Sequence, residues 1–386
     1  MAMRNYLRVW VVIGLFLIVS ACSEKPLSSP IQANIVTSSK NSDIEGYTRA
    51  TPGRGLSFPQ DEGPHPDYQT EWWYYTGNLI STDGQRFGYQ LTFFRRALLP
   101  LAEIKQRSSD LATTQAYLAH FAISDVARQQ HQAFDRFSRG AAGLAGAQAS
   151  PFKVWVYNWN VDESGPRATS LYAAQGSYEL SLHLLDSKGP VLNGDNGYSQ
   201  KGPEPGSASY YYSLTHLNTD GTLRIDNQLF KVTGTSWMDH EFSTSALSQG
   251  QIGWDWFSVQ LADQRELMFY QIRRDDHTLD PHSSGTVISA DGSYHHIPQS
   301  DFKIIVTGTW KSPHTHAIYP AHWIVEIPSE GLILEISPQI SDQEINLSYT
   351  YWEGAVKIVG KDGAKPIAGF GYVELTGYAG SIAGQF

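Results

Sequence analysis

The chain has 386 residues, a formal net charge of −10 and a single cysteine. A net acidic chain without a basic tract is not expected to bind nucleic acid or to adhere electrostatically to anionic lipid. One cysteine excludes an internal disulfide, so the fold must rest on a hydrophobic core, for which 11 Trp, 21 Tyr and 16 Phe are available.

The first residues have the pattern of an export signal. Arg4 and Arg8 precede an apolar run over residues 9–19, which is followed by Ser20-Ala21-Cys22. The run is shorter than the ~20 residues that span a bilayer as a helix. Small residues before a cysteine resemble the bacterial lipobox. We expect residues 1–21 to be a lipoprotein signal peptide and Cys22 to carry the lipid; an ordinary signal peptide and an uncleaved anchor are the alternatives.

The segment that follows has the composition of a tether. Residues 22–52 are rich in Ser, Asn, Lys and Pro, so they cannot bury enough surface to offset the entropy lost on ordering. Ser23, rather than Asp, after the cysteine resembles lipoproteins that are sorted to an outer membrane. The expected location is the bacterial cell envelope, with a lipid anchor in the outer membrane and the body facing the periplasm.

The body, from about Gly53 onward, is predicted to be all-β. Runs rich in Tyr, Trp, Phe, Val, Ile and Thr are separated by clusters of Gly, Asp, Asn, Ser and Pro, as in antiparallel strands joined by tight turns. Regularly spaced short strands are typical of sandwiches and barrels. The stretches 98–115 and 139–149 are expected to be loops or short helices. Candidate strands lie at residues 73–79, 87–94, 117–124, 153–159, 178–185, 210–217, 256–261, 266–272, 302–308, 322–327, 332–336, 349–359 and 371–375.

The second series of strands repeats the first. Residues 234–239 and 369–374 share the order Gly, any residue, small, aromatic, aliphatic, acid. Segments near 209–225 and 72–91 have similar counterparts near 348–358 and 254–272. We therefore expect a duplicated β domain with a seam at residues 239–250. The predicted domains are residues 53–240 and 241–386.

Glu71, Trp73 and Tyr75 form the first candidate ligand site. Alternate residues of a strand point to opposite faces, so these three side chains should share one face. A carboxylate beside aromatic rings could hold or polarise a ligand inside a barrel. The alternative is a core strand in which the aromatics fill the end of the barrel while Glu71 pairs with an Arg.

Asp239, His240 and Glu241 are the candidate catalytic residues. An imidazole titrates near neutrality and can act as an acid or a base when a carboxylate orients it. Nearby Trp237, Trp254, Asp255 and Trp256 are candidate ligand-binding residues, because aromatic walls lower the local dielectric and shift the pKa values of charged groups. The alternative is a buried ion pair at the seam.

Two more side chains could face a ligand, and a metal site is not expected. His120 could point inward from a strand, and Arg139 could reach a carboxylate across a barrel; surface positions are the alternative for both. His240-Glu241 does not start a zinc-protease motif, because Thr244 stands where the second His should be. No cofactor is expected.

Several long motifs of the chain resemble the AttH and carotenoid 1,2-hydratase superfamily, whose members are tandem lipocalin-like proteins. The match extends from about Pro59 to Ala379. The motifs are DEGPHP at 61–66, EWWYYTGNL at 71–79, AHFAISD at 119–125, SWMDHEF at 236–242, YWEGAV at 351–356 and GYVELTGY at 371–378. The resemblance implies two lipocalin-type antiparallel β-barrels packed together.

The resemblance also implies a chemistry. In the hydratase branch, water adds to a polyene double bond without a cofactor, through protonation to a cation, and the residues concerned lie around the Asp-His motif, here Asp239-His240. This chain has Glu241 and Phe242 where that branch has Asn and Trp, and Gln271 near the position of an acid. The AttH branch, often linked to export systems, therefore fits better.

Our leading hypothesis from the sequence is a lipid-anchored envelope protein that binds or carries a lipophilic small molecule in a lipocalin-like barrel. One alternative is a cofactor-independent hydratase or hydrolase that acts on an isoprenoid-like or carotenoid-like substrate with His240 and Asp239 or Glu241. The other is a structural accessory of an export transporter. The expected partners are the lipophilic ligand, the membrane through Cys22 and such a transporter.

Overall fold

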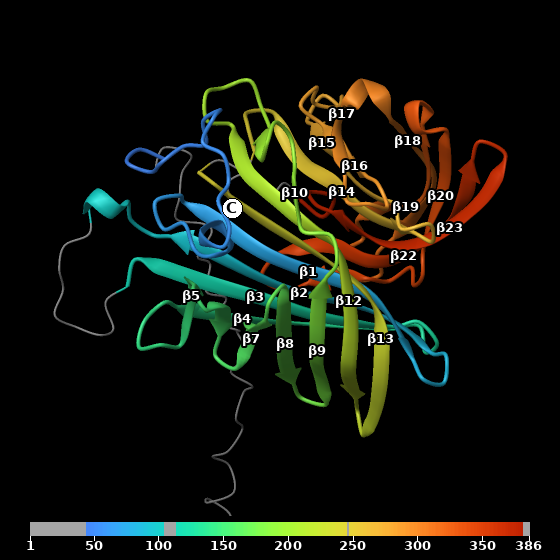
Figure 1. The fold of residues 1–386 in the computed structure, drawn as a ribbon, viewed down its shortest axis with the longest axis horizontal. Coiled ribbons are helices and arrows are strands. Elements are labelled where there is room, and N and C mark those ends of the chain that lie inside the picture. The colour runs from blue at the N-terminus through green and yellow to red at the C-terminus, as the bar shows by residue number, and fades with distance from the viewer. Residues whose placement is uncertain (1–43, 104–112, 245–246, 381–386) are drawn as a thin grey trace, which may run out of the picture. The chain divides into compact units, whose positions relative to one another are not determined.

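The structure is a computed structural model that describes residues 44–103, 113–244 and 247–380. Apart from short 3-10 turns, its regular elements are strands, and they form two antiparallel sheets (Figure 1). The predicted signal peptide, Cys22 and most of the predicted tether lie outside the described residues. None of the described helices is long and apolar enough to cross a membrane.

The first sheet has 13 strands in the order β4-β3-β2-β1-β13-β12-β9-β8-β7-β6-β5, with β10 and β11 also paired to β12. The bounds are β1 Thr70–Ser81, β2 Arg86–Ala97, β3 Gln115–Asp125, β4 Gln130–Arg139, β5 Ala145–Ala149, β6 Phe152–Val156, β7 Trp159–Gly165, β8 Ala168–Gln175, β9 Tyr178–Asp186, β10 Pro190–Leu192, β11 Tyr198–Gln200, β12 Ala208–Ile225 and β13 Gln228–Ser243.

The second sheet has 10 strands in the order β17-β16-β15-β14-β23-β22-β20-β19-β18, with β21 also paired to β22. The bounds are β14 Gln251–Leu261, β15 Glu266–Arg274, β16 Ser284–Ile288, β17 Tyr294–Pro298, β18 Lys303–Lys311, β19 Ile318–Ile327, β20 Leu332–Pro338, β21 Glu344–Asn346, β22 Thr350–Asp362 and β23 Lys365–Leu375. The 3-10 turns are η1 Gln60–Glu62, η2 Leu101–Glu103, η3 Gln299–Asp301 and η4 Pro328–Glu330.

Both sheets curl around hydrophobic cores of their own, and one forms a nearly closed barrel. The prediction of an all-β protein with two tandem lipocalin-like barrels is confirmed. Within the stretch 139–149, expected to be a loop or a helix, β5 is instead a strand paired to β6. The first sheet ends at Ser243 and the second begins at Gln251.

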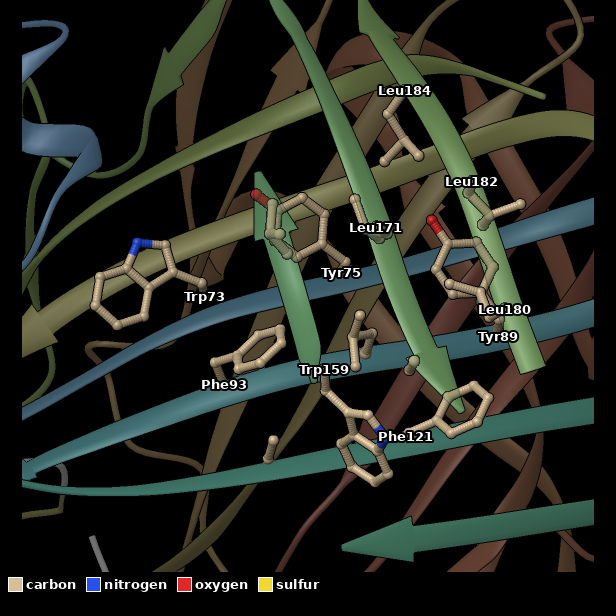
Figure 2. Packing of buried hydrophobic residues seen from close by; sticks show 14 of the residues in the cluster. Trp73, Tyr75, Tyr89, Phe93, Phe121, Trp159, Leu171, Leu180, Leu182 and Leu184 are labelled. Carbon is tan, nitrogen blue, oxygen red and sulfur yellow. The ribbon is translucent and has the colours of Figure 1, made fainter. Parts of the chain in front are cut away.

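The inward-facing side chains of β1 belong to the core of the first barrel. Figure 2 shows Trp73 and Tyr75 packed among aromatic and leucine side chains from β2, β3, β7, β8 and β9. Both side chains are almost fully buried, with 0% and 1% of their surface exposed. These two aromatics fill the barrel, as the core alternative for this strand predicted.

The last half of β13 is buried on both faces. Its first residues alternate between buried and exposed positions, whereas every residue from Ser236 to Ser243 is buried. One face of this segment looks into the first barrel, where Met238 joins the core. The other face packs with Tyr74 of β1, Trp256 of β14 and Tyr372 of β23 in a separate cluster that joins the two sheets.

The last residues of the predicted tether belong to the folded body. The Thr48 amide donates to the carbonyl of Asp67, Ala50 is fully buried, and the Thr51 amide donates to the Tyr210 hydroxyl at 3.0 Å. The prediction of a tether through residue 52 is therefore wrong for residues 48–51. The polar composition of residues 48–51 does not reveal that backbone hydrogen bonds attach this segment to the folded body.

Candidate functional site

A narrow cavity lies where the outer faces of the two sheets meet, and its volume, measured as the space open to the centre of a water-sized sphere, is about 70 Å³. This is room for a few waters or for part of a small ligand. Each sheet contributes several strands to the wall. The lining residues are Trp72, Tyr74, Gln90, Phe94, Lys201, Tyr211, Asp239, Glu241, Ser243, Leu247, Trp254, Trp256, Tyr270, Ile272 and Glu374.

Asp239, on β13, is the most heavily hydrogen-bonded carboxylate of the wall. The Tyr211 hydroxyl donates to Oδ2 at 2.7 Å, while the Ser213 hydroxyl and the Trp237 indole N–H donate to Oδ1 at 2.5 and 2.7 Å. Burial raises the pKa of Asp239 to about 7, against the lowering effect of these three donors and with a further rise from Glu241. The carboxyl group therefore changes charge near neutral pH.

Glu374, on β23, is the second such carboxyl group. The Trp254 indole N–H donates to its Oε2 at 3.1 Å. Burial raises the pKa of Glu374 to about 7, the Trp254 hydrogen bond lowers it, and the negative charges of Asp239 and Glu241 raise it further. The negative charge of Asp239 therefore makes Glu374 harder to ionise.

The repeat explains why these two acids face one cavity. In the first sheet Asp239 lies opposite Tyr74 on β1, and in the second sheet Glu374 lies opposite Trp256 on β14. Asp239 and Glu374 are the final acids of the repeated segments 234–239 and 369–374. Each half of the duplicated chain therefore supplies one carboxyl group from the corresponding position of its sheet.

Glu241 shares its face of β13 with Asp239 and has a cationic partner. The Lys201 ammonium group lies 3.3 Å from Glu241 Oε1, and the Ser209 hydroxyl donates to the same oxygen. Burial lowers the pKa of Lys201, but Glu241 and Tyr270 outweigh that effect and the pKa is raised. Lys201 is therefore a charged group on the cavity wall.

His240 points the other way, into the first barrel. Its ring stacks on Trp73 at 4.8 Å between centroids, and its Nε2 lies 2.9 Å from Glu71 Oε1. Neither Asp239 nor Glu241 can pair with it, because neighbouring residues of a strand face opposite sides. The predicted catalytic group of three consecutive residues is wrong in this respect: the structure brings Asp239 and Glu241 together and separates His240 from both.

Glu71 is the centre of a buried ion network around His240. Arg95 Nε lies 2.6 Å from Glu71 Oε2, and His65 Nδ1 lies 2.7 Å from Oε1. Burial alone would raise the pKa of Glu71, but Arg95, His240 and His65 hold it well below its usual range. His65 in turn reaches Asp61, with 2.8 Å between its Nε2 and the carboxylate. Glu71 pairs with an Arg, as the core alternative for this strand predicted.

One donor atom each from His65, Glu71 and His240 lie within 4.8 Å of one another, a spacing that could surround a metal ion. Both histidines are hydrogen-bonded to Glu71, and the guanidinium of Arg95 contacts the same carboxylate. A further cation here would face that guanidinium in a buried setting. The donor set fits an ion network better than a metal site.

The other predicted residues divide between the cavity and the rest of the protein. Trp254 and Trp256 line the cavity. Asp255, between them, points into the second barrel, where Arg273 and Tyr378 hold it. Trp237 lies behind the wall as a donor to Asp239.

His120 and Arg139 are not part of the cavity wall. His120 is buried on the outer face of the first sheet, 2.8 Å from the hydroxyl of Tyr351, and burial lowers its pKa to about 4. Arg139 is exposed at the end of β4. The expectation that His120 points into the barrel is therefore wrong, and Arg139 takes the surface position that was its alternative.

Residues 49–378 match the family model of AttH-like proteins. The chain belongs to the AttH-like family. A solved structure assigned to AttH, from Nitrosomonas europaea, is similar over 86% of this chain and 99% of its own, with 34% sequence identity and a TM-score of 0.76. The family expected from the motifs is confirmed, and the match covers both barrels.

The AttH-like chain also resembles kievitone hydratase. The enzyme of Fusarium solani subsp. phaseoli is 26% identical over 193 residues, which are 48% of this chain and 53% of the relative. The chain thus matches about half the length of this curated relative. The crystal structure of kievitone hydratase from Nectria haematococca covers 86% of this chain and 96% of its own, with 16% identity and a TM-score of 0.66, and shows the same fold.

Sequence reasoning missed several polar residues of the cavity of the AttH-like chain, including Lys201, Tyr211, Tyr270 and Glu374. For Glu374 a signal was present, because the repeat aligns it with Asp239. The other three come from distant segments, and only the folded sheets bring them to the cavity.

Glu374→Gln is expected to flatten the pH dependence of stability. The pKa of this carboxyl rises from 4.5 to about 7 on folding, so the folded state keeps a proton that the unfolded state loses. The wild type should therefore lose on the order of 3 kcal/mol of unfolding free energy, relative to the variant, between pH 4.5 and 7. Urea unfolding across that range measures the difference; parallel curves for the two proteins would contradict the assignment.

Proposed function

We propose that this AttH-like protein is a cofactor-independent hydratase of a lipophilic alkene, with its active site in the cavity between the sheets. One observation carries the proposal: Asp239 and Glu374 line one aromatic-walled cavity and have pKa values of about 7. Near neutral pH each of the two groups is partly protonated, so one can act as an acid while the other acts as a base. The similarity to kievitone hydratase supports the same reaction class.

The numbers of hydrogen-bond donors suggest which carboxyl group does what. Asp239 accepts three hydrogen bonds and Glu374 accepts one from Trp254. Donors favour the ionised form, so Asp239 serves as the carboxylate and Glu374 as the carboxylic acid. Glu374 gives its proton to one carbon of the double bond, and the other carbon becomes a cation. Water forms the C–O bond there and passes a proton to Asp239, and exchange with solvent restores both groups.

Aromatic rings and carboxylates would stabilise the intermediate cation. Trp72, Trp254 and Trp256 line the cavity with four further aromatic side chains. The faces of such rings attract positive charge, and the attraction is stronger where water is excluded. The developing charge also lies beside Asp239 in its ionised form, which lowers the energy of the cation relative to the neutral alkene.

Isotope incorporation tests this proposal directly. The purified protein is incubated with a panel of prenylated aromatic compounds, isoprenoids and polyenes in water enriched in oxygen-18, and the products are analysed by mass spectrometry. The expected result is an alcohol that carries the heavy oxygen and is absent when the protein is boiled first. A panel that returns unchanged, although at least one compound binds in the cavity, contradicts a hydratase.

The same cavity supports the carrier function as a second candidate. Its walls are mainly aromatic, which suits an apolar molecule without any reaction. A carrier would return its ligand unchanged after extraction from the purified protein. Two acids that titrate near pH 7 have no evident use in a carrier, and for that reason the hydratase comes first.

We also propose that Cys22 carries a lipid and holds the protein at the outer membrane, facing the periplasm. The support is the order of residues 4–22: basic, apolar, small and then cysteine. Mass spectrometry of the mature N-terminus should find acylated Cys22, and Cys22→Ala should release the body into the soluble envelope fraction. An unmodified Cys22 in the native protein contradicts the anchor.

A further inference from the structure

The cavity between the sheets already holds one ammonium group. Lys201 Nζ lies 4.0 Å from the ring centroid of Tyr270, 5.0 Å from that of Tyr211 and 3.3 Å from Glu241 Oε1. Only 13% of the surface of its side chain is exposed to solvent. Burial disfavours a charge, but the Glu241 carboxylate and the Tyr270 hydroxyl more than offset the lost hydration, so the pKa of Lys201 is raised. The faces of the two rings attract the ammonium in addition.

The other part of the cavity wall has the same components without a cation of its own. It contains Asp239 and Glu374 with the rings of Tyr74, Trp254 and Trp256. Among the described residues that line the cavity, Lys201 is the only Lys or Arg, against three carboxyl groups. Lys201 is paired with Glu241, which leaves Asp239 and Glu374 without a cationic partner in the wall.

Two residues of the cavity wall carry buried polar atoms that have no partner within the described part of the protein. Gln90 Oε1 and Ser243 Oγ have no hydrogen-bond partner among the described residues, and both residues are almost fully buried, with 0% and 1% of their surface exposed. Leaving such an atom unpaired costs about 1–3 kcal/mol. The carbonyl oxygen Gln90 Oε1 can only accept a hydrogen bond, so a group that donates N–H or O–H fits this place.

We propose that the cavity binds the protonated amino group of a lipophilic amine, with the ammonium beside Asp239 and Glu374 and the apolar part against the tryptophans. The N–H groups would donate to the carboxylates. This inference rests on the proposed function in that the ammonium takes the place of the short-lived cation of hydration. An amine would accordingly act as a stable mimic of that intermediate and as an inhibitor.

Affinity for the amine should increase with pH. Asp239 and Glu374, each with a pKa of about 7, are mostly protonated at pH 6 and mostly ionised at pH 8, whereas an alkylamine stays protonated at both. Each ionised carboxylate adds attraction for the ammonium. The other titratable and charged groups that line the cavity with the pair are Tyr74 of β1, Tyr211 of β12, Glu241 of β13, Tyr270 of β15 and Lys201. Outside the lining, the buried carboxyl group of Glu353 on β22 lies opposite Glu374, and burial together with the charge of Glu374 raises its pKa.

The test compares three probes with the same chain and different head groups: hexylammonium, 1-hexanol and hexanoate. Isothermal titration calorimetry on the full protein at pH 8 should give hexylammonium at least tenfold tighter binding than 1-hexanol, with hexanoate the weakest. At pH 6 the preference for hexylammonium over 1-hexanol should fall at least threefold. Equal binding of the charged and neutral probes at pH 8, or tighter binding of hexanoate, overturns the proposal.

Glu374→Gln should lower the preference for hexylammonium at pH 8, and the matched change Glu335→Gln, at an exposed position on β20, should leave it unchanged. The outcome is independent of the isotope experiment. Preferential binding of the amine without hydration of any alkene supports the cation-binding site and rejects the hydratase. Hydration of an alkene without preferential binding of the amine supports the hydratase and rejects the cation-binding site.

Discussion

Arg95→Met is expected to lower the free energy of unfolding by about 3–5 kcal/mol, the largest effect on stability that the structure predicts. The guanidinium donates to Glu71 and to the carbonyls of His65 and Tyr68, and its side chain is only 1% exposed. Methionine fills similar space but leaves the Glu71 carboxylate buried without its cation. Urea unfolding followed by tryptophan fluorescence measures the loss.

Two controls separate this ion-network effect from the loss of any arginine. Arg167→Met removes the partner of Asp186 at a position where half of the arginine side chain is exposed, 53%, and should cost no more than about 1 kcal/mol. The double variant Glu71→Gln with Arg95→Met removes both charges and should recover part of the loss. A cost below about 1 kcal/mol for Arg95→Met alone would show that the network contributes little.

Asp239→Asn and Glu374→Gln are each expected to lower the rate of hydration by about 10²–10⁴-fold, because each removes one half of the acid–base pair. The wild-type rate should depend on pH as a bell centred near pH 7: below it both groups hold protons and no base remains, and above it neither can donate. In the Glu374→Gln variant, the residual activity should no longer fall on the alkaline side of the pH profile, because that fall reports the loss of the proton from Glu374.

Asp255→Asn is the matched control for these two variants. It also removes a buried carboxyl group. Asp255 stands between Trp254 and Trp256 in the sequence, but its side chain points into the second barrel, where it contacts Arg273 and Tyr378. Its rate at saturating substrate should stay within a few-fold of the wild type in folded protein. If all three variants lose activity alike, the losses come from a weakened fold and not from the chemistry in the cavity.

The fold was largely predictable because its signals are local. Alternation of apolar residues, turn residues and the repeat lie within short windows of sequence. The stretch 139–149 misled for a local reason too: β5 is made of Ala, Gly and Gln, which have little β propensity, and pairing with β6 decides its conformation. Residues 48–51 were assigned to a tether because backbone hydrogen bonds leave no trace in composition.

The candidate site was predictable in part. Asp239, Trp254 and Trp256 were found because acids and tryptophans cluster near the seam. Adjacency in the sequence places His240 beside Asp239 and Glu241, but alternate residues of β13 face opposite sides, so the strand itself separates His240 from the two acids. Arg95 and Lys201 depend on contacts between distant segments, so no local pattern could reveal them.

Because each repeat supplies part of the cavity wall, ligand binding in the cavity is coupled to the packing of the two sheets against each other. Asp239 comes from one sheet and Glu374 from the other. A molecule that contacts both carboxyl groups therefore stabilises the packing of one sheet against the other. By mass action, a ligand at 100 times its Kd adds about 2.7 kcal/mol to the stability of the docked pair. The reverse also holds: a substitution that populates the undocked state, even far from the cavity, lowers the apparent affinity for the ligand in proportion to the fraction of molecules that stay docked.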